Sequence, residues 1–279
     1  MAPLSHCPSL KDMIIKIMTI IAIGVVDNLI QRDVITNRPI IHSSSLKGAL
    51  LEHCNCETCL KNKNNSNNED TIKDIFGSES SAGKYRFFDA HLLAIPVRSN
   101  KTPYLMATCP SVINQYIKTF SLFGLNAPSI EMPVVTTPIV GNNNVNSAYI
   151  EDIEAKTSYN NSPIFKSLEE IIGCDAPIVL LSDSDFDTLC DDNHLPVIAR
   201  NQLNNGESKN LWYEQVLPRF SVLYFPLIAD DKNGKDIYSN FKNCIENCLV
   251  QIGANASVGY GFCQLTDVTV EETPQPSNK

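Results

Sequence analysis

Long apolar runs separated by polar turns predict a chain rich in buried strands. Residues 13–26 are dominated by apolar side chains, contain a single charge at Lys16, and predict the first core strand. Residues 84–98 are nearly continuous in apolar residues, which is typical of a central strand covered on both faces. Apolar stretches at 177–183 and 211–229 predict further strands.

Apolar positions at helical spacing predict several helices between these strands. Pro110 stands at the start of one of them, where a helix tolerates proline best. Gly253 directly follows another and is its expected C-terminal cap. The predicted helices cover residues 46–54, 71–76, 109–124, 164–172 and 241–252.

The order of these elements predicts an α+β fold with a mostly antiparallel sheet, compatible with a ferredoxin-like core, in a single domain over residues 1–279. Residues 55–70 are rich in asparagine and predict a flexible insertion loop. Residues 126–165 combine prolines, a GNNN turn and β-prone segments, which predict a projecting hairpin or irregular excursion. Residues 271–279 are expected to form a tail.

One stretch, residues 24–50, concentrates polar chemistry. Asp27 follows the first apolar run, and Ser43–Ser45 stand where helix N-caps are found. Lys47 falls in the first helical turn, where a cation is unfavourable unless an anion docks at the same helix end. Gly48 leaves the next backbone position bare. Amides, hydroxyls and a lysine predict a phosphate site, although on this segment alone a plain serine-capped helix is the favoured alternative.

Composition narrows the kind of partner. The 279 residues carry a net charge of −9 and a sequence pI near 5.0, which argues against binding nucleic acid through a broad basic face. Ten cysteines without a secretory signal indicate buried, reduced thiols and a cytoplasmic protein. No run approaches the ~20 apolar residues that a membrane span requires.

A cysteine-rich segment follows the first predicted helix. His53, Cys54, Cys56 and Cys59 supply four side chains of the types that bind zinc. Two of them are adjacent, and the second pair of a standard knuckle is missing. Three loop cysteines are therefore the simpler interpretation, and a structural zinc site is the alternative.

Five motifs in sequence carry a family resemblance. They are GVVDNLIQRDV, SSSLKGAL, FGSESSAGKYRFFDAHLLAIPVRS, LWYEQVLP and QIGANASVGYGF. Together they span roughly residues 24–270 and resemble, in matching order, the backbone (fourth Cmr) subunits of type III-B CRISPR effector complexes. These subunits belong to the RAMP superfamily, whose RNA-binding core is ferredoxin-like.

The resemblance implies that several copies stack along a guide crRNA together with the other Cmr subunits. A projecting thumb hairpin, assigned to residues 126–165, interrupts the guide–target duplex, and the target RNA is cleaved at regular intervals. It assigns the catalytic carboxylate to Asp27, working with a divalent metal, Mg²⁺ or Mn²⁺. The RNA-contacting residues would be Gln31, Arg32, Ser43, Ser44, Ser45, Lys47, Gly48, Lys84, Gly259 and Gly261.

Two departures leave a second hypothesis open. The family usually carries a glycine-rich stretch with a histidine upstream of GVVD, whereas this chain reads KIMTIIAI there. After LWYEQVLP the family often has an acidic residue, and this chain has Phe220. The alternative to an RNA-guided ribonuclease is therefore a guide-binding filament subunit with impaired cleavage.

Overall fold

The computed structural model describes residues 10–19, 23–24, 30–55, 68–141, 148–151, 153–155, 157–158, 163–230, 237–246 and 248–268. Asp27, Cys56, Cys59 and the tail at 271–279 lie outside these residues, as does most of the predicted loop at 55–70.

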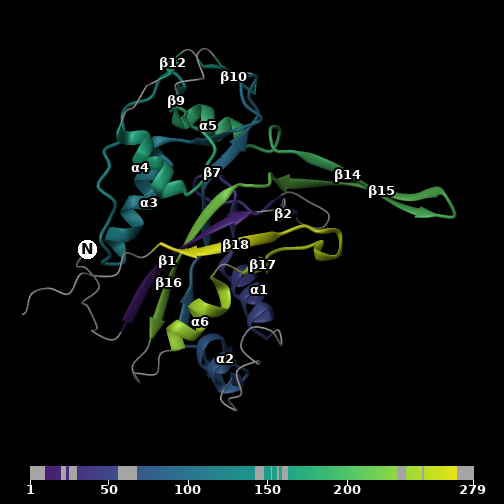
Figure 1. The fold of residues 1–279 in the computed structure, drawn as a ribbon. Coiled ribbons are helices and arrows are strands. Elements are labelled where there is room, and N and C mark those ends of the chain that lie inside the picture. Colours follow the sequence, from purple (N-terminus) through teal and green to yellow (C-terminus); the bar gives the residue numbers. More distant parts are fainter. Residues whose placement is uncertain are drawn as a thin grey trace, which may run out of the picture.

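A large mixed sheet forms the centre of the molecule (Figure 1). Strand β1 (Leu10–Thr19) lies between β16 (Val222–Asp230) and β18 (Phe262–Asp267) and is antiparallel to both. Strand β7 (Ala90–Val97) is antiparallel to β16 on its other side. Most residues of β7 are buried, which confirms the central strand expected from the apolar run at 84–98.

Shorter strands extend the sheet on both sides. Beyond β7, the sheet continues through β8, β13, β9 and β12, and β17 lies at the opposite edge. Strand β3 pairs with β7, and β6 pairs with β16. Their bounds are β3 Ile40–Ile41, β6 Tyr85–Phe87, β8 Leu105–Thr108, β9 Ile139–Val140, β12 Thr157–Ser158, β13 Ile178–Leu180 and β17 Leu249–Gln251.

Six α-helices of the described residues cover the sheet in two groups (Figure 1). Helices α1, α2 and α6 gather at one end, where Phe241 of α6 packs edge-on against Phe76 and Tyr85. Helices α3, α4 and α5 gather at the other end. Their bounds are α1 Ser43–Asn55, α2 Asn68–Phe76, α3 Pro110–Leu122, α4 Pro163–Ile172, α5 Asp183–Leu189 and α6 Ile237–Ile245. The α+β architecture expected from the sequence is confirmed.

Two element predictions were wrong in extent. The run at 13–26 is divided between β1 and β2 (Ile23–Gly24). The predicted helix 241–252 ends at Ile245, because β17 turns to pair with β18. Gly253, with φ 97°, therefore caps no helix and instead lies in the turn after β17.

Lys16 interrupts the first apolar run without breaking the strand. Its Nζ donates to the backbone oxygen of Ile171 at 3.1 Å, near the C-terminus of α4. The ammonium group thus meets the negative end of the helix dipole. Burial lowers the pKa of Lys16, and the charge of Cys174 opposes that shift.

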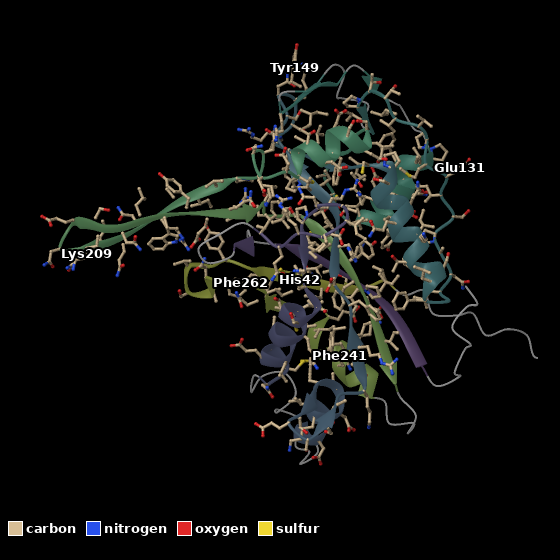
Figure 2. All side chains as sticks on the ribbon, turned by 180° about the vertical axis from the view of Figure 1, so that it is seen from behind. His42, Glu131, Tyr149, Lys209, Phe241 and Phe262 are labelled. Carbon is tan, nitrogen blue, oxygen red and sulfur yellow. The ribbon has the colours of Figure 1, made fainter. Side chains whose placement is uncertain are left out.

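The hairpin that projects from the described part of the chain is not the predicted one. Strands β14 (Val197–Asn204) and β15 (Glu207–Leu217) extend well beyond the sheet, with Lys209 near the far end (Figure 2). The described parts of 126–165 hold short strands, among them β10 (Ala148–Ile150) and β11 (Ile153–Ala155), and the start of α4. Ile150 of β10 is fully buried. Residues 142–147 and 159–162 lie outside the described residues, so the projecting excursion at 126–165 stays a prediction.

Within the described residues, no helix is long and apolar enough to cross a membrane.

Candidate nucleic-acid interface

A pocket of about 220 Å³ lies beside the start of α1. It brings together the loop before α1, the serine-rich first turn and the glycine-rich loop after β17, which are far apart in the sequence. The lining residues are Ile30, Gln31, Pro39, Ile40, Ile41, Ser45, Leu217, Ile252, Gly253 and Ala254. Two of the predicted RNA-contacting residues, Gln31 and Ser45, therefore share one cavity.

Gln31 organises the polar side of this pocket. Its Oε1 accepts from the backbone N–H of His42 at 2.8 Å, and its Nε2 donates to Ser45 Oγ at 3.3 Å. Its backbone oxygen accepts from Ile40 N–H at 3.0 Å. These bonds hold the loop against the first turn of α1, so the pocket is formed before any ligand arrives.

The N-terminus of α1 differs from the expectation. The helix begins at Ser43, so the serines occupy its first turn and do not cap it. The capping anion is Asp89, whose Oδ1 accepts from the Ser43 N–H at 2.7 Å. A carboxylate there satisfies one of the free helix amides. Because that anion is already present, a phosphate at this end must depend on the outer side chains of the turn.

Those outer side chains are accessible. Ser44 and Ser45 are exposed and Lys47 is half-buried. A Cβ placed on Gly48 would meet nothing within 4 Å, so the surface beside Lys47 is open. Two hydroxyls and an ammonium group on an open helical turn form a plausible contact for a phosphate backbone.

Arg32 points inward, contrary to the prediction that it contacts RNA. Its Nε and Nη2 bind Asp192 Oδ1 at 2.9 and 2.7 Å, and its Nη1 donates to the backbone oxygens of Asn37 and Cys190, both at 2.7 Å. Gln215 Nε2 donates to the Asp192 backbone oxygen at 3.1 Å. Arg32 therefore positions the loop and fastens it to the segment before β14.

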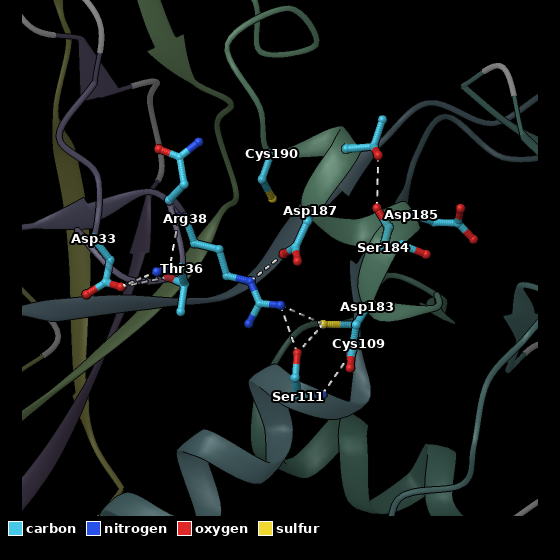
Figure 3. A network of polar contacts seen from close by, with 12 residues as sticks. Asp33, Thr36, Arg38, Cys109, Ser111, Asp183, Ser184, Asp185, Asp187 and Cys190 are labelled. Carbon is cyan, nitrogen blue, oxygen red and sulfur yellow. Dashed lines mark hydrogen bonds and ion pairs between the residues drawn. The ribbon is translucent and has the colours of Figure 1, made fainter.

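A second arginine fastens the same loop to the far helices (Figure 3). Arg38 Nε binds Asp187 Oδ1 at 2.6 Å, and its Nη2 donates to Ser111 Oγ at 2.8 Å. The N–H of Ser111 in turn donates to Asp183 Oδ1 at 2.9 Å. Burial would raise the pKa of Asp183, but the Ser111 hydrogen bonds outweigh it and leave the pKa lowered. The network orients the loop, and its carboxylates Asp183 and Asp187 are exposed on α5.

A third network joins the glycine-rich loop to the base of the β14–β15 hairpin. Glu214 is 1% exposed, and its carboxylate accepts from Trp212 Nε1 at 2.8 Å and from Arg200 Nε at 3.0 Å. It also accepts from Asn255 Nδ2 at 3.0 Å. The Arg200 guanidinium lies 4.9 Å from the ring centroid of Tyr260. One buried carboxylate thus links the hairpin to the loop that walls the pocket.

The glycines of this loop serve its geometry. Gly259, with φ 87°, ends the short 3₁₀ turn η1 (Ala256–Val258). Gly261, with φ 76°, is in close contact with Ile252, because an added Cβ would lie 2.1 Å from the Ile252 oxygen. Both glycines therefore shape the loop beside the pocket, and neither lines it.

Replacing Gly261 by alanine is expected to lower the free energy of unfolding by about 2 kcal/mol or more, because both the left-handed backbone and the contact with Ile252 oppose a side chain. Thermal or urea unfolding of purified protein measures this change. Gly206→Ala is the matched control, since Gly206 has φ 87° but nothing within 4 Å of an added Cβ. Equal losses for the two variants would contradict the close-contact argument.

The remaining predicted site residues do not join the pocket. Lys84 Nζ binds Asp74 Oδ2 of α2 at 2.9 Å. His53 Nε2 lies 3.1 Å from the backbone oxygen of Cys244, and Cys54 Sγ lies 3.4 Å from Cys244 Sγ. No group of three or more metal-binding side chains occurs among the described residues. Cys56 and Cys59 of the predicted zinc site and Asp27 of the predicted divalent-metal site lie outside the described residues, so both metal sites stay predictions.

Sequence reasoning missed several residues that build this surface. Asp89, the cap of α1, carries no local signal, since it lies 46 residues from its partner. Glu214 and Gln215 belong to the LWYEQVLP motif, and their positions directly before the end of an apolar strand were the available signal.

The chain is similar to several known proteins. A family model described as the RAMP superfamily matches residues 14–264. The "CRISPR system Cmr endoribonuclease Cmr4" of Pyrococcus furiosus is 27% identical over 270 residues, covering 88% of each chain. A solved oligomeric Cmr4 from Pyrococcus furiosus has a TM-score of 0.74 at 24% identity, covering 93% of this chain and 98% of the other.

A similar chain also occurs in a solved assembly. The structure described as type III-B Cmr-beta bound to cognate target RNA contains a chain with a TM-score of 0.69 at 20% identity. The match covers 92% of this chain and 96% of that one. At this identity the likeness bears on the fold alone.

Proposed function

The chain belongs to the RAMP superfamily, and on that premise we propose that it is the backbone subunit of a type III-B CRISPR effector complex. In this role it binds guide crRNA, associates with further copies of itself and with other Cmr subunits, and cleaves complementary target RNA. The names of its relatives support each part: one is called an endoribonuclease, another is oligomeric, and a third is bound to target RNA.

The observation that carries the proposal is the pocket beside α1. It unites Gln31, Ser45 and the glycine-rich loop, which belong to three separate motifs of the resemblance. The serine hydroxyls and Lys47 on an open turn suit a sugar–phosphate backbone. Such local contacts also reconcile RNA binding with a net charge of −9, because they require no broad basic face.

We assign the thumb role to the β14–β15 hairpin. It is the long projecting element of the described chain (Figure 1), and its side chains include exposed Leu203, Leu211 and Tyr213. An extended two-stranded ribbon with apolar side chains can separate stacked bases, since apolar wedges unstack neighbouring bases in other nucleic-acid complexes. The Glu214 network holds its base, so the hairpin acts as a fixed strut against the RNA.

Cleavage requires little covalent chemistry from the protein, because RNA carries its own nucleophile. The 2′-oxygen forms a bond to phosphorus while the 5′-oxygen leaves, and the reaction is accelerated when a nucleotide is held splayed and in line. Asp27 is assigned to accept or orient the 2′-hydroxyl proton. Asp27 would hold a divalent ion such as Mg²⁺ or Mn²⁺, which would stabilise the negative charge that develops on the phosphate oxygens.

Guide binding is tested by reversing one charge. Lys47→Glu is expected to weaken binding of guide RNA. It should also reduce the slope of log Kd against log[salt] by about one, because one phosphate contact is lost. Filter binding or fluorescence anisotropy across a salt series measures both effects.

Lys118→Glu is the matched control, since Lys118 is an exposed lysine on α3 with the same charge change. If both variants lose affinity equally, the loss reflects net charge, and the assignment of Lys47 to a phosphate contact is wrong.

A further inference from the structure

A second cavity, of about 710 Å³, lies at the base of the β14–β15 hairpin. Its walls come from the β7–β8 connection, the segment before β14 and the turn between β15 and β16. Four prolines line it, namely Pro96, Pro103, Pro196 and Pro218. This volume falls in the range of small-ligand sites, and the proline-rich walls favour a preformed shape.

The floor of this groove contains a residue with an energetically unfavourable backbone conformation. The turn 218–221 is closed by hydrogen bonds from the N–H and Oγ of Ser221 to the backbone oxygen of Pro218, at 3.3 and 2.8 Å. Phe220 is the third residue of that turn and has φ 72°. Glycine or asparagine is the usual residue for such a conformation, and a bulky residue there is strained. A bulky ring that occupies this position at such a cost suggests that the ring itself is used.

The Phe220 ring stacks on Tyr104. Their centroids are 5.6 Å apart and their planes differ by 17°. The guanidinium of Arg219 lies 5.2 Å from the centroid of Phe220. Both rings are half-buried and line the groove together with Arg219, so this wall combines a stacked aromatic pair with a cation that lies over one of its rings.

The rest of the lining is polar and held in place. Arg98, with its side chain 88% exposed, binds Glu151 at 2.6 Å, and His194 Nδ1 lies 2.8 Å from Asp191 Oδ1. The segment 189–196 is fastened from behind by the bond from Arg32 to the Cys190 oxygen. The stacked aromatic pair with the Arg219 guanidinium beside it suits a base with its attached phosphate.

We propose that this groove binds one unpaired RNA nucleotide, whose base stacks on the Tyr104–Phe220 pair and whose phosphate contacts Arg219. The inference rests on the proposed RNA-guided function and locates a subsite for it. Pro218 of the groove directly follows Leu217 in the chain. Leu217 pairs with Ile23, and Ile23 directly precedes Gly24, the first residue of the GVVD motif. A nucleotide seated there is displaced from base pairing beside the strand that leads into the cleavage motif.

The test is Phe220→Gly in the complex assembled with guide RNA. Glycine accepts φ 72°, so the fold is kept while the ring is removed. Target-RNA affinity is expected to fall about 5- to 150-fold, the worth of one base–aromatic stack, with no loss in unfolding temperature. Phe220→Tyr should restore binding. Phe88→Ala, which removes a ring of the Phe88–Phe123 pair outside the groove, is the control and should bind as wild type.

Abasic nucleotides show whether the groove binds the guide strand or the target strand. An abasic site is moved one nucleotide at a time along the target, and in a parallel series along the guide. At the position that occupies the groove, the abasic site should weaken wild type and leave Phe220→Gly unchanged. An abasic effect that depends on Phe220, in either strand, supports the proposal and shows whether the bound nucleotide belongs to the guide or to the target.

Three results would separate this inference from the proposed function. Wild-type affinity in Phe220→Gly overturns the nucleotide site but leaves RNA binding intact. Loss of self-association in Phe220→Gly without coupling to any abasic position shows that the groove meets protein, and also overturns it. If the wild type binds neither guide nor target, the proposed function itself fails.

Discussion

Replacement of Asp27 by alanine is expected to abolish cleavage of target RNA while guide-directed binding persists. A carboxylate that moves or orients a proton contributes about 10²- to 10⁴-fold to the rate, so the loss should be at least 10²-fold. The measurement is single-turnover cleavage of labelled complementary RNA by the assembled complex with Mg²⁺ or Mn²⁺. Wild type should give evenly spaced products that vanish in Asp27→Ala.

Two comparisons make the result specific. Asp27→Asn keeps the size of the side chain and should be as inactive as alanine, because the charge is what acts. Asp175→Asn removes an exposed carboxylate of the loop before β13 and should cleave normally. Tight binding with no products from the wild type would instead establish a structural subunit, and would point to the missing upstream histidine and to Phe220 as the reasons.

Replacement of Glu214 by alanine is expected to lower the free energy of unfolding by about 3 kcal/mol. The change removes a 1% exposed carboxylate and leaves the donors of Trp212, Arg200 and Asn255 without their acceptor. Urea denaturation measures the loss, and hydrogen exchange should show faster opening at the hairpin base and in the glycine-rich loop. Glu207→Ala, an exposed glutamate near the hairpin tip, is the control and should stay near wild type.

The same carboxylate gives a pH signature. Burial would raise the pKa of Glu214, but hydrogen bonds from Trp212, Arg200 and Asn255 outweigh it, so the folded-state pKa lies below the ordinary value of 4.5. A group with a lowered folded-state pKa stabilises the protein above its unfolded-state pKa, and that stability is lost as the pH falls toward the folded-state value. Wild type should therefore lose more stability than Glu214→Gln as the pH falls below about 4.5. Parallel curves for the two proteins would show that the carboxylate is not held as described.

The comparison of sequence with structure separates two kinds of prediction. The buried strand β7 and the proline-started helix α3 were predictable, because a continuous apolar run and helical spacing are local properties of the chain. The end of α6 was not predictable, because the apolar residues of β17 continue the helical spacing of α6. Strand β17 forms only through its pairing with β18. The projecting β14–β15 hairpin was not predicted for a similar reason: the strands at 197–217 look ordinary, and only their lack of a covering layer makes them project.

The candidate site shows the same division. The sequence by itself determined the inventory: a loop with Gln31, a serine-rich helix start with Lys47, and a glycine-rich loop, each recognisable from residue type and short spacing. Only the tertiary structure decided that Gln31, Ser45 and Gly253 line one pocket. It also turned Arg32 inward to Asp192 and placed Asp89 as the cap of α1. These contacts join residues 46 to 160 positions apart, and their choice depends on the packing of the whole sheet, which no local pattern encodes.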